Sequence, residues 1–449
     1  MRASLVTFVL TVLCCRSLIA NDWPQFRGPR GDGHAEARNL PTTWGGFLQP
    51  PAWQTDIPGT GWSSPIVVGD RIWLTSAELT ALTAEAQEQK LAQNPFGKIE
   101  RFQVHASVSL LAVELDATNG KTLRRLRLFS REDPAPIHFA NSYASPTPVT
   151  DGNRLYCHFG SLGTVAVSLE TGQIDWQTRF VVDDITGPGS SPVLCGDRLV
   201  LACDGGDEQY LVALDSQTGA VAWRTPRPKI DATEGRLRRA FCTPLVIRHG
   251  GRRQIIAPSA QWVVSYDPDS GQELWRANLG PGHALIPRPV FRQGLVYVCT
   301  GYTKPELIAL RADGTGDVTQ THLVWRYDKQ VPEISSPIVV GNEIYFVSAM
   351  GIATCLDAET GKLCWQQRLK GSYSASPLAA DGKLFFTSVQ GITTVLRPGS
   401  EFNELARNQL FGQTLASLAI AGESILIRTA PTLYCVRKRT ANPKESVHD

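Results

Sequence analysis

The chain has 449 residues, a formal net charge of +2, 39 glycines and 29 prolines. Because the charge is nearly balanced and no long block of like charges occurs, the composition gives no reason to expect nucleic acid or an anionic membrane surface as a partner. The length alone favours two or three domains, but internal repeats override this expectation.

Residues 1–20 have the features of a signal peptide for export. Arg2 supplies a basic start, and the apolar core from Leu5 to Cys15 is too short to span a bilayer. Cys14 has no small residue directly before it, which argues against a lipoprotein. We therefore expect an exported protein in the periplasm or the cell envelope, without an integral membrane span.

Residues 21–50 form the next segment, which is rich in Gly, Pro and Arg and has no hydrophobic periodicity. We expect an N-terminal arm that lies over the main fold through Trp23 and Phe26. The alternative is that the arm contributes to a binding site, and the residues that would then contact a ligand are Arg27, Arg30 and Asp32.

The stretch from Ser335 to Trp365 contains four short runs rich in β-branched and aromatic residues, separated by turn signals. Runs of this length are too short for amphipathic helices and predict a four-stranded antiparallel meander. Such a unit alone would leave its faces exposed to water, so it needs copies of itself.

Two markers of these copies recur along the chain. The first is Asp-x-x-Thr/Ser-Gly with Trp four residues after the Gly, and the complete copies end at Trp223, Trp275 and Trp365. An incomplete copy has Arg124 where the Trp is expected. The second marker is a small residue before proline at the start of each unit, with variants at two positions. Its members are Ser64, Ser145, Ser191, Thr243, Ser336 and Ser376, and the variants are Arg288 and Ser417. A repeat of about 40 residues is typical of propeller blades.

Eight markers predict an all-β fold over residues 51–437, an eight-bladed β-propeller of four-stranded antiparallel blades. The last unit has only three strands, whereas the run around Trp53 is a single strand without a unit of its own. We expect this N-terminal strand to close the last blade, because closure removes an open sheet edge. Residues 438–449 are polar, and we expect a disordered tail.

The first blade contains a predicted helical insertion at about residues 77–107. Residues 78–94 are rich in strong helix formers, and Pro95 ends the run. The insertion falls between the second and third strands, on the same side as the connections between successive blades. We call this side the loop face. Its connections are long, whereas the opposite side has mostly tight turns, so we expect the loop face to bind ligands or partners.

The tryptophan motif resembles the tryptophan-docking repeat of the PQQ-repeat β-propellers. That family includes quinoprotein alcohol dehydrogenases and the propeller lipoprotein of the outer-membrane protein assembly complex. The opening from Asp22 to Gly33 resembles that of secreted bacterial members with no assigned chemistry. The resemblance is specific for the fold and much less so for the function, because one fold serves many functions.

Three functional hypotheses follow from the resemblance and the residues. The first is an exported, non-catalytic propeller that binds a protein partner or a small acidic ligand on its loop face. The second is a quinoprotein-like oxidoreductase that depends on PQQ and calcium. The resemblance to such enzymes implies a pair of adjacent cysteines, which the mature chain lacks. The third is a scaffold in outer-membrane protein assembly. No catalytic residue, cofactor or metal site is predicted, since metal-binding and nucleophile-elbow motifs do not occur.

The candidate ligand-binding residues are Arg288, His283, His138 and Asn141. Arg288 interrupts a series of small hydroxyl residues that should line the central channel. It either points to solvent or pairs with an acidic residue such as Glu333, or it forms an anion site with His283 as a second donor. His138 and Asn141 belong to a long connection on the same loop face.

Eight cysteines remain after the signal peptide, and most lie inside predicted strands, as small buried hydrophobic residues do. Cys355 and Cys364 are expected directly opposite each other across a tight turn. An exported protein allows a disulfide between them, and the sequence leaves both alternatives, a disulfide or two free thiols.

Overall fold

The structure is a computed structural model that describes residues 22–46, 49–93, 101–184 and 186–438. The predicted signal peptide and nearly all of the predicted tail lie outside the described residues. Within the described ranges, no helix combines the length and apolarity needed to cross a membrane.

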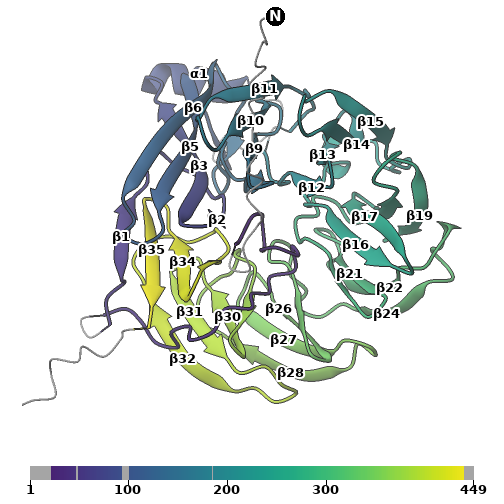
Figure 1. Ribbon diagram of the computed structural model, residues 1–449. Helices are drawn as coiled ribbons and strands as arrows, with labels where there is room; N and C mark the ends of the chain where they lie inside the picture. The colour runs from purple at the N-terminus through teal and green to yellow at the C-terminus, as the bar shows by residue number, and fades with distance from the viewer. Residues whose placement is uncertain (1–21, 47–48, 94–100, 185, 439–449) are drawn as a thin grey trace, which may run out of the picture.

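Eight antiparallel sheets, the blades, are arranged in a ring around a central axis (Figure 1). Four strands lie side by side in each blade. Each strand carries two to eleven residues, and its buried side chains contact the neighbouring sheets. One hydrophobic cluster, for example, joins Val149 and Tyr156 of one sheet to Leu199 and Val212 of the next. The eight-bladed β-propeller predicted from the repeats is therefore confirmed.

The first four blades are built in chain order from the inner strand outward. Blade 1 contains β2 (Ile66–Val68), β3 (Arg71–Thr80), β5 (Ser107–Asp116) and β6 (Thr122–Glu132). Blade 2 contains β8 (Val149–Thr150), β9 (Arg154–His158), β10 (Thr164–Ser168) and β11 (Ile174–Thr178). Blade 3 contains β12 (Val193–Cys195), β13 (Arg198–Asp204), β14 (Gln209–Asp215) and β15 (Val221–Pro226). Blade 4 contains β16 (Leu245–His249), β17 (Arg252–Ser259), β18 (Trp262–Tyr266) and β19 (Glu273–Asn278).

The other four blades repeat this order. Blade 5 contains β20 (Val290–Arg292), β21 (Leu295–Cys299), β22 (Leu307–Arg311) and β24 (Leu323–Tyr327). Blade 6 contains β25 (Ile338–Val340), β26 (Glu343–Val347), β27 (Ile352–Asp357) and β28 (Leu363–Arg368). Blade 7 contains β29 (Leu378–Ala380), β30 (Lys383–Thr387), β31 (Ile392–Leu396) and β32 (Glu404–Gln409). Blade 8 contains β33 (Ala419–Ala421), β34 (Ser424–Arg428), β35 (Thr432–Arg437) and β1 (Trp53–Asp56).

Three short elements lie outside this scheme. The two-residue strands β4 (Phe102–Gln103) and β7 (Ile137–His138) pair with each other on the loop face. In the insertion of blade 5, β23 (Gly316–Asp317) adds a parallel fifth strand to the outer edge of β19.

The N-terminal strand closes the ring, as predicted. β1 pairs antiparallel with β35, and Trp53 lies opposite Cys435. Figure 1 shows this junction as the purple strand β1 beside the yellow strand β35. The last blade thus takes its outer strand from the opposite end of the chain, so the two ends of the propeller hold each other.

The fourth-strand tryptophans contact the next blade through a repeated pair of interactions. The indole Nε1 of Trp223 donates to the carbonyl of Pro268 at 2.9 Å, and a Cβ added at Gly271 would lie 2.5 Å from the same ring. Trp176 has the same relation to Ser216 and to Gly219. The glycine of the motif therefore provides both the positive φ of the turn and the space for the neighbouring indole.

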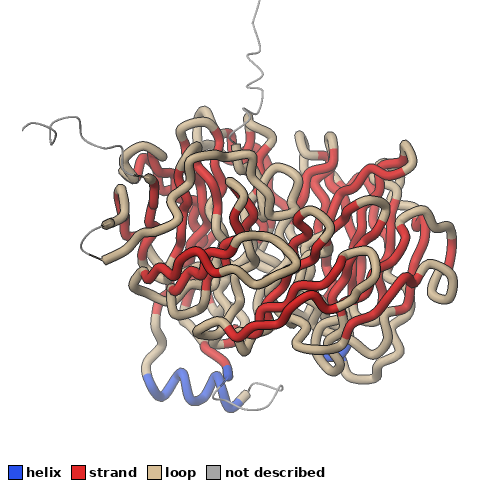
Figure 2. The backbone as a smooth tube through the Cα atoms, turned by 90° about the horizontal axis from the view of Figure 1, so that it is seen from below, coloured by secondary structure: helices blue, strands red, loops and turns tan. Residues whose placement is uncertain are grey.

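The insertion between the second and third strands of blade 1 contains a helix. Helix α1 (Ala84–Ala92) begins after Thr83, whose hydroxyl accepts from the amide of Ala86 at 3.3 Å. It is shorter than predicted because residues 78–80 continue β3 and pair with β5. Figure 2 shows α1 and the 3-10 helix η2 (Gly235–Leu237) on the same side of the propeller, which is the loop face.

The predicted pairing of Cys355 with Cys364 is wrong. Cys355 lies opposite Trp365, because a β-bulge in the β27–β28 pair leaves Cys364 without a direct partner. The same register shift occurs next to the motif in the β14–β15 and β18–β19 pairs, so it is a feature of the repeat. Both cysteines are free thiols.

Candidate functional site

A chain of hydrogen bonds runs around the inner strands and lines the central channel. Before the first strands of seven blades, the backbone amide of one blade donates to a hydroxyl of the next blade, at 2.9–3.1 Å. The bonds run from Ser64 to Thr147, Thr147 to Ser191, Ser191 to Thr243, Arg288 to Ser336, Ser336 to Ser376, Ser376 to Ser417, and Ser417 to Ser64. These side chains are buried, so they hold adjacent blades together.

The sequence predicts Ser145 as the ring residue of blade 2, and this prediction is wrong. Thr147 occupies that position in the ring. Ser145 and Thr147 each precede a proline, but only Thr147 and its proline lie directly before the first strand, β8. Ser145 instead donates to the side chain of Asn141 at 2.5 Å, within the preceding connection.

Arg288 interrupts the hydroxyl ring between blades 4 and 5. Its side chain is 1% exposed, and its Nε donates to the carbonyl of Pro244 at 3.1 Å, which bridges the gap in the ring. It neither points to solvent nor pairs with Glu333, which were the two structural alternatives. Burial lowers the pKa of Arg288 to about 10.

The N-terminal arm covers Arg288 on the side of the tight turns. The carbonyl of Phe26 accepts from Nη1 of Arg288 at 2.6 Å, and a Cβ added at Gly31 would lie 2.4 Å from the same nitrogen. The arm pairs with β2 through Trp23 and with β29 through His34. In Figure 1 it is the dark purple trace that runs from the centre of the ring to β1.

His283 does not join Arg288 through any contact in the described part of the chain. Its backbone pairs with Tyr302, and its Nδ1 lies 3.0 Å from the hydroxyl of Thr303. Burial, with a smaller contribution from Arg236, lowers the pKa of His283, so the ring is neutral at pH 7. His283 therefore belongs to a loop contact and not to the channel wall.

His138 and Asn141 remain on the loop face, but they have different surroundings. Asn141 donates to the carbonyls of Thr186 and Pro188 and thereby ties two successive connections together. His138 is half-buried, stacks against Phe139 and accepts from the amide of Ala140 at 3.2 Å. The predicted site residues are therefore divided between the channel (Arg288) and three separate loop contacts.

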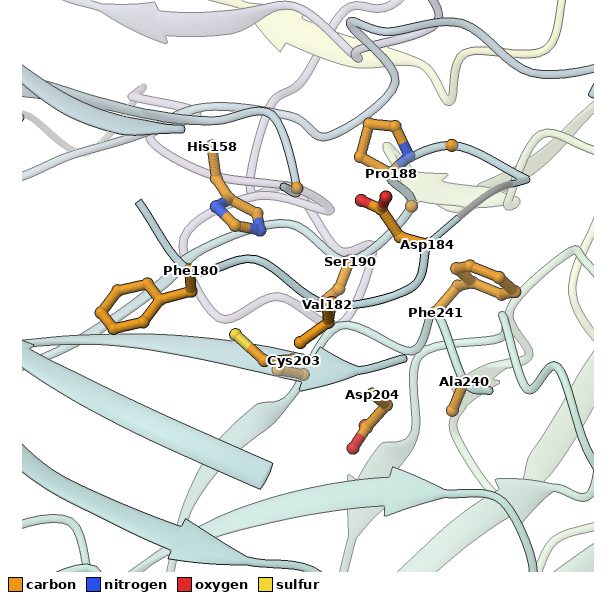
Figure 3. A pocket seen from close by; sticks show the side chains of 14 residues that line it. His158, Phe180, Val182, Asp184, Pro188, Ser190, Cys203, Asp204, Ala240 and Phe241 are labelled. Carbon is orange, nitrogen blue, oxygen red and sulfur yellow. The ribbon is translucent and has the colours of Figure 1, made fainter. Parts of the chain in front are cut away.

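A cavity of about 30 Å³ lies on the loop face between blades 2 and 3 (Figure 3). His158, Asp184, Ser190 and Phe241 are among the residues that line it. The ring of His158 and the carboxylate of Asp184 both face this space (Figure 3). Pockets that bind organic molecules usually have about 300–1,000 Å³, so this cavity is too small for most organic substrates.

Burial favours the neutral forms of His158 and Asp184, two of the titratable groups that line this cavity. Burial lowers the pKa of His158 to about 4, and its Nδ1 lies 2.8 Å from the hydroxyl of Thr164. Burial raises the pKa of Asp184, while the amide of Ser161, which donates to its carboxylate at 2.9 Å, opposes this shift. The hydroxyl of Ser190 donates to the carbonyl of Cys242 at 3.1 Å, so this polar group of the lining also has a partner within the protein.

Next to this cavity lies a buried ion pair between Asp204 and Arg227. Two nitrogens of Arg227 meet the two carboxylate oxygens of Asp204 at 2.9 and 2.8 Å. Both side chains are 1% exposed. The planar bidentate geometry satisfies both charges, and the pair fixes the connection that leads from blade 3 to blade 4.

Exposed apolar side chains occur in two places on the propeller. One set lies on the fourth strands, at the outer rim of the blades. Its members are Leu123, Ile174, Val221, Leu323, Val324 and Leu363. The other set lies in five connections of the loop face. Its members are Phe139, Val181, Tyr302, Met350 and Phe411.

The second set, which we call the loop-face apolar set, is the stronger signal for a binding surface. The outer-rim residues recur next to the tryptophan motif and are explained by the repeat. The loop-face residues have no common motif, and Phe411 and Met350 are 86% and 70% exposed. Exposed apolar side chains on the face that carries the long connections favour this face over the opposite one as an interaction surface.

Metal binding by protein side chains needs several ligating groups close together. In the described ranges, no three His, Cys, Asp or Glu side chains come together in a way that would hold a metal ion.

Sequence reasoning missed His158, Asp184 and the loop-face apolar set. His158 ends the second strand of its blade, where the other blades have mostly small or apolar residues, and this difference was readable. Phe411 and Met350 are isolated apolar residues in short polar connections, which is a readable signal of exposure. Asp184 has no such signal, because its burial depends on how the connection folds back.

Comparisons with known proteins place this chain in a family. The family model described as outer membrane protein assembly factor BamB matches residues 50–261, 259–352 and 317–398. The solved structure of BamB from Moraxella catarrhalis is similar, with 11% identity and a TM-score of 0.55, over 86% of this chain and 99% of that chain. The comparison with curated proteins found no match.

Two quinohemoprotein alcohol dehydrogenases share the fold. The enzyme from Comamonas testosteroni has 14% identity and a TM-score of 0.53, and ADHIIG from Pseudomonas putida HK5 has 11% identity and a TM-score of 0.57. Each match covers 94% of this chain and 82% of the enzyme. Because the matched family segments together cover most of the sequence, the chain belongs to the PQQ-repeat β-propeller family described by outer membrane protein assembly factor BamB.

Proposed function

We propose that the protein is an exported, non-catalytic propeller that binds a protein partner on its loop face, in the periplasm or the cell envelope. The loop-face apolar set carries this proposal. Its five side chains come from five different connections, so a partner that covers them would contact much of the face. Burial of apolar surface is the main favourable term in protein association.

The other features of the molecule agree with a binding role. The loop-face cavity is too small for most organic substrates, and the arm covers the opposite end of the channel around Arg288. The scaffold of blades holds the connections in fixed positions, which reduces the entropic cost of binding. Helix α1 adds a projecting element beside the same surface.

The family match favours a more specific candidate, a scaffold in outer-membrane protein assembly. The description of the family model names such an assembly factor, and the match to the Moraxella catarrhalis protein covers 99% of that chain. Under this candidate the partner is a component of the assembly machinery or a client protein. A strain that lacks the protein should then contain less folded outer-membrane protein.

Site-specific crosslinking tests the proposal. A photoreactive residue is placed at Met350 or Phe411 on the loop face, or at Val221 or Leu363 on the outer rim as matched exposed controls. We expect the two loop-face positions to link to the same protein in intact cells and the rim positions to give no such product. Equal products from both sets, or none from the loop face, would contradict the proposal.

A combined variant provides the functional control. With the photoreactive residue placed at Val181 instead, replacing Phe139, Met350 and Phe411 by serine should abolish the crosslinked product while the melting temperature is unchanged, because these side chains are exposed. Restoration of outer-membrane protein levels by the unaltered protein but not by this variant would support the assembly candidate. Dye reduction after addition of PQQ and calcium would instead support a quinoprotein-like oxidoreductase.

A further inference from the structure

Two arginines lie side by side beneath the N-terminal arm, at the end of the channel that faces away from the loop face. Arg27 belongs to the arm and Arg288 to the start of blade 5, and their exposed fractions are 2% and 1%. Burial lowers the pKa of Arg27 to about 9, Asp32 opposes this shift, and the positive charge of Arg288 adds to it. The two guanidiniums therefore repel each other in a region from which water is largely excluded.

The partners of these guanidiniums in the structure are neutral acceptors. Nη2 of Arg27 donates to the carbonyls of Pro337 and Asp32 at 2.8 and 3.1 Å. Arg288 donates to the carbonyls of Pro244 and Phe26 and, at 3.5 Å, to the side chain of Gln25. Carbonyl oxygens satisfy N–H groups but do not neutralise a buried charge.

Asp32 is the nearby carboxylate, and its oxygens bond elsewhere. One oxygen accepts from Nε of Arg30 at 3.1 Å, and the other accepts from the amide of His34 at 3.0 Å. Asp32 therefore acts on Arg27 and Arg288 through space, without a direct bond. The buried thiols of Cys242 and Cys299 also face these arginines, and burial raises the pKa of both, so they carry no negative charge.

Arg27 also has two buried N–H groups, Nε and Nη1, that find no partner among the described residues. A buried polar group without a hydrogen bond is rare in folded proteins and indicates a bound water molecule or ion. A water molecule would satisfy the two N–H groups but would leave the repulsion between two positive charges. A small anion would satisfy both requirements.

We propose that a single small anion of the size of chloride binds at Nε and Nη1 of Arg27, beneath the arm and near Arg288. The anion accepts from Nε and Nη1 of Arg27 and lowers the electrostatic cost of placing this residue beside Arg288. Arm glycines leave little room for a larger ligand, because a Cβ at Gly31 or Gly33 would lie 2.4 or 2.7 Å from the two guanidiniums. The anion therefore fastens the arm to the channel and is separate from the loop-face function.

Bromide provides a direct probe, because it replaces chloride and scatters X-rays anomalously. Crystals of the mature protein grown in sodium bromide should show an anomalous peak within hydrogen-bond distance of Nε and Nη1 of Arg27. Density without an anomalous signal at this position would identify a water molecule and overturn the proposal. No density there would overturn it as well.

Thermal unfolding gives an independent measurement. At constant ionic strength, replacing gluconate by chloride should raise the melting temperature by about 2 °C for each tenfold increase above the dissociation constant. The Arg27→Met variant should lose this dependence, whereas Arg38→Met, an exposed arginine of the same arm, should keep it. An equal chloride effect in the Arg27→Met variant would contradict the proposal. If that variant does not fold, the bromide crystals of the unaltered protein still decide the question.

Discussion

Arg124 stands in blade 1 where most other blades have the fourth-strand tryptophan. Its Nη2 donates to the carbonyl of Leu169 at 2.5 Å, in the same way as the indole of Trp223 donates to Pro268. Its Nε forms an ion pair with the buried Glu114. The guanidinium thus makes the bond that the repeat requires, and it also compensates a buried carboxylate.

In blade 4, Gln254 takes part in the corresponding contact between blades. The insertion of blade 5 changes the turn that Trp275 would contact, and the indole of Trp275 donates to Gln254 at 2.9 Å instead. Gln254 in turn donates to the carbonyl of Ala312 in blade 5 at 3.0 Å. One side-chain amide therefore relays the contact between the blades.

His158 leads to a prediction about acid stability. Its pKa of about 4 in the folded protein lies below the ordinary value of 6.5, so between these values the unfolded chain binds a proton that the folded protein does not. The free energy of unfolding should therefore fall as the pH falls from 6.5 to 4, by up to about 3 kcal/mol from this residue. We expect His158→Gln to lack this part of the loss in urea unfolding at pH 7 and pH 4.5.

The control for this prediction is Thr387→Val, at the end of β30, because the hydroxyl of Thr387 is buried beside Thr393 and does not titrate in this range. The difference between pH 7 and pH 4.5 should be the same in this variant as in the unaltered protein. If the His158 variant also shows the full loss, burial of a neutral imidazole does not determine the acid sensitivity.

At the scale of elements, the turns between the third and fourth strands contact the fourth strand of the neighbouring blade. Asp357 accepts from the hydroxyl and the amide of Thr360, which closes the turn before Gly361. The ring of Trp325, from the previous blade, then packs on Gly361. Because turn and tryptophan come from different blades, the motif stabilises the interface between blades and not the blade alone.

Two glycines with similar backbone conformations test this role. Gly219 and Gly382 have φ of 73° and 67°, but a Cβ at Gly219 would lie 2.6 Å from Trp176, whereas Gly382 has no neighbour within 4 Å. We expect Gly382→Ala to cost about 1–2 kcal/mol, from the left-handed conformation alone. Gly219→Ala should cost clearly more, because the indole must move. Equal losses in urea unfolding would show that the contact with Trp176 contributes nothing.

At the scale of the whole molecule, closure depends on two distant segments. β1 completes blade 8, and the ring of backbone-to-hydroxyl bonds ends with Ser417 donating to Ser64. The arm then crosses the channel and contacts blades on both sides of this junction. Opening the junction would expose the edge of β35 and the apolar face of blade 8.

We therefore predict that β1 is essential for a soluble monomer. Replacing residues 51–57 by a Gly/Ser linker of equal length keeps the arm attached but removes the strand. The variant should aggregate or lose its cooperative transition, as measured by light scattering and thermal unfolding. The same replacement at residues 231–237, on the loop face, serves as control. A soluble and equally heat-stable β1 variant would show that closure is not needed.

The sequence by itself determined the number of blades, the position of the insertion and the closing strand. These features depend on local patterns, such as the turn at Asp357 to Gly361, which act within a few residues and repeat along the chain. The order of the strands follows, because consecutive short strands with tight turns pair antiparallel. The N-terminal strand around Trp53 was predictable because only one blade lacked a strand.

Only the tertiary structure decided the surroundings of the candidate site residues. Arg288 was recognisable as an exception in the ring, but its burial beneath Phe26 and its position beside Arg27 depend on an arm without periodicity. Thr147 and Ser145 are equivalent in sequence, and only strand pairing distinguishes them. Contacts between residues far apart in sequence depend on how the whole chain packs, and no local pattern records them.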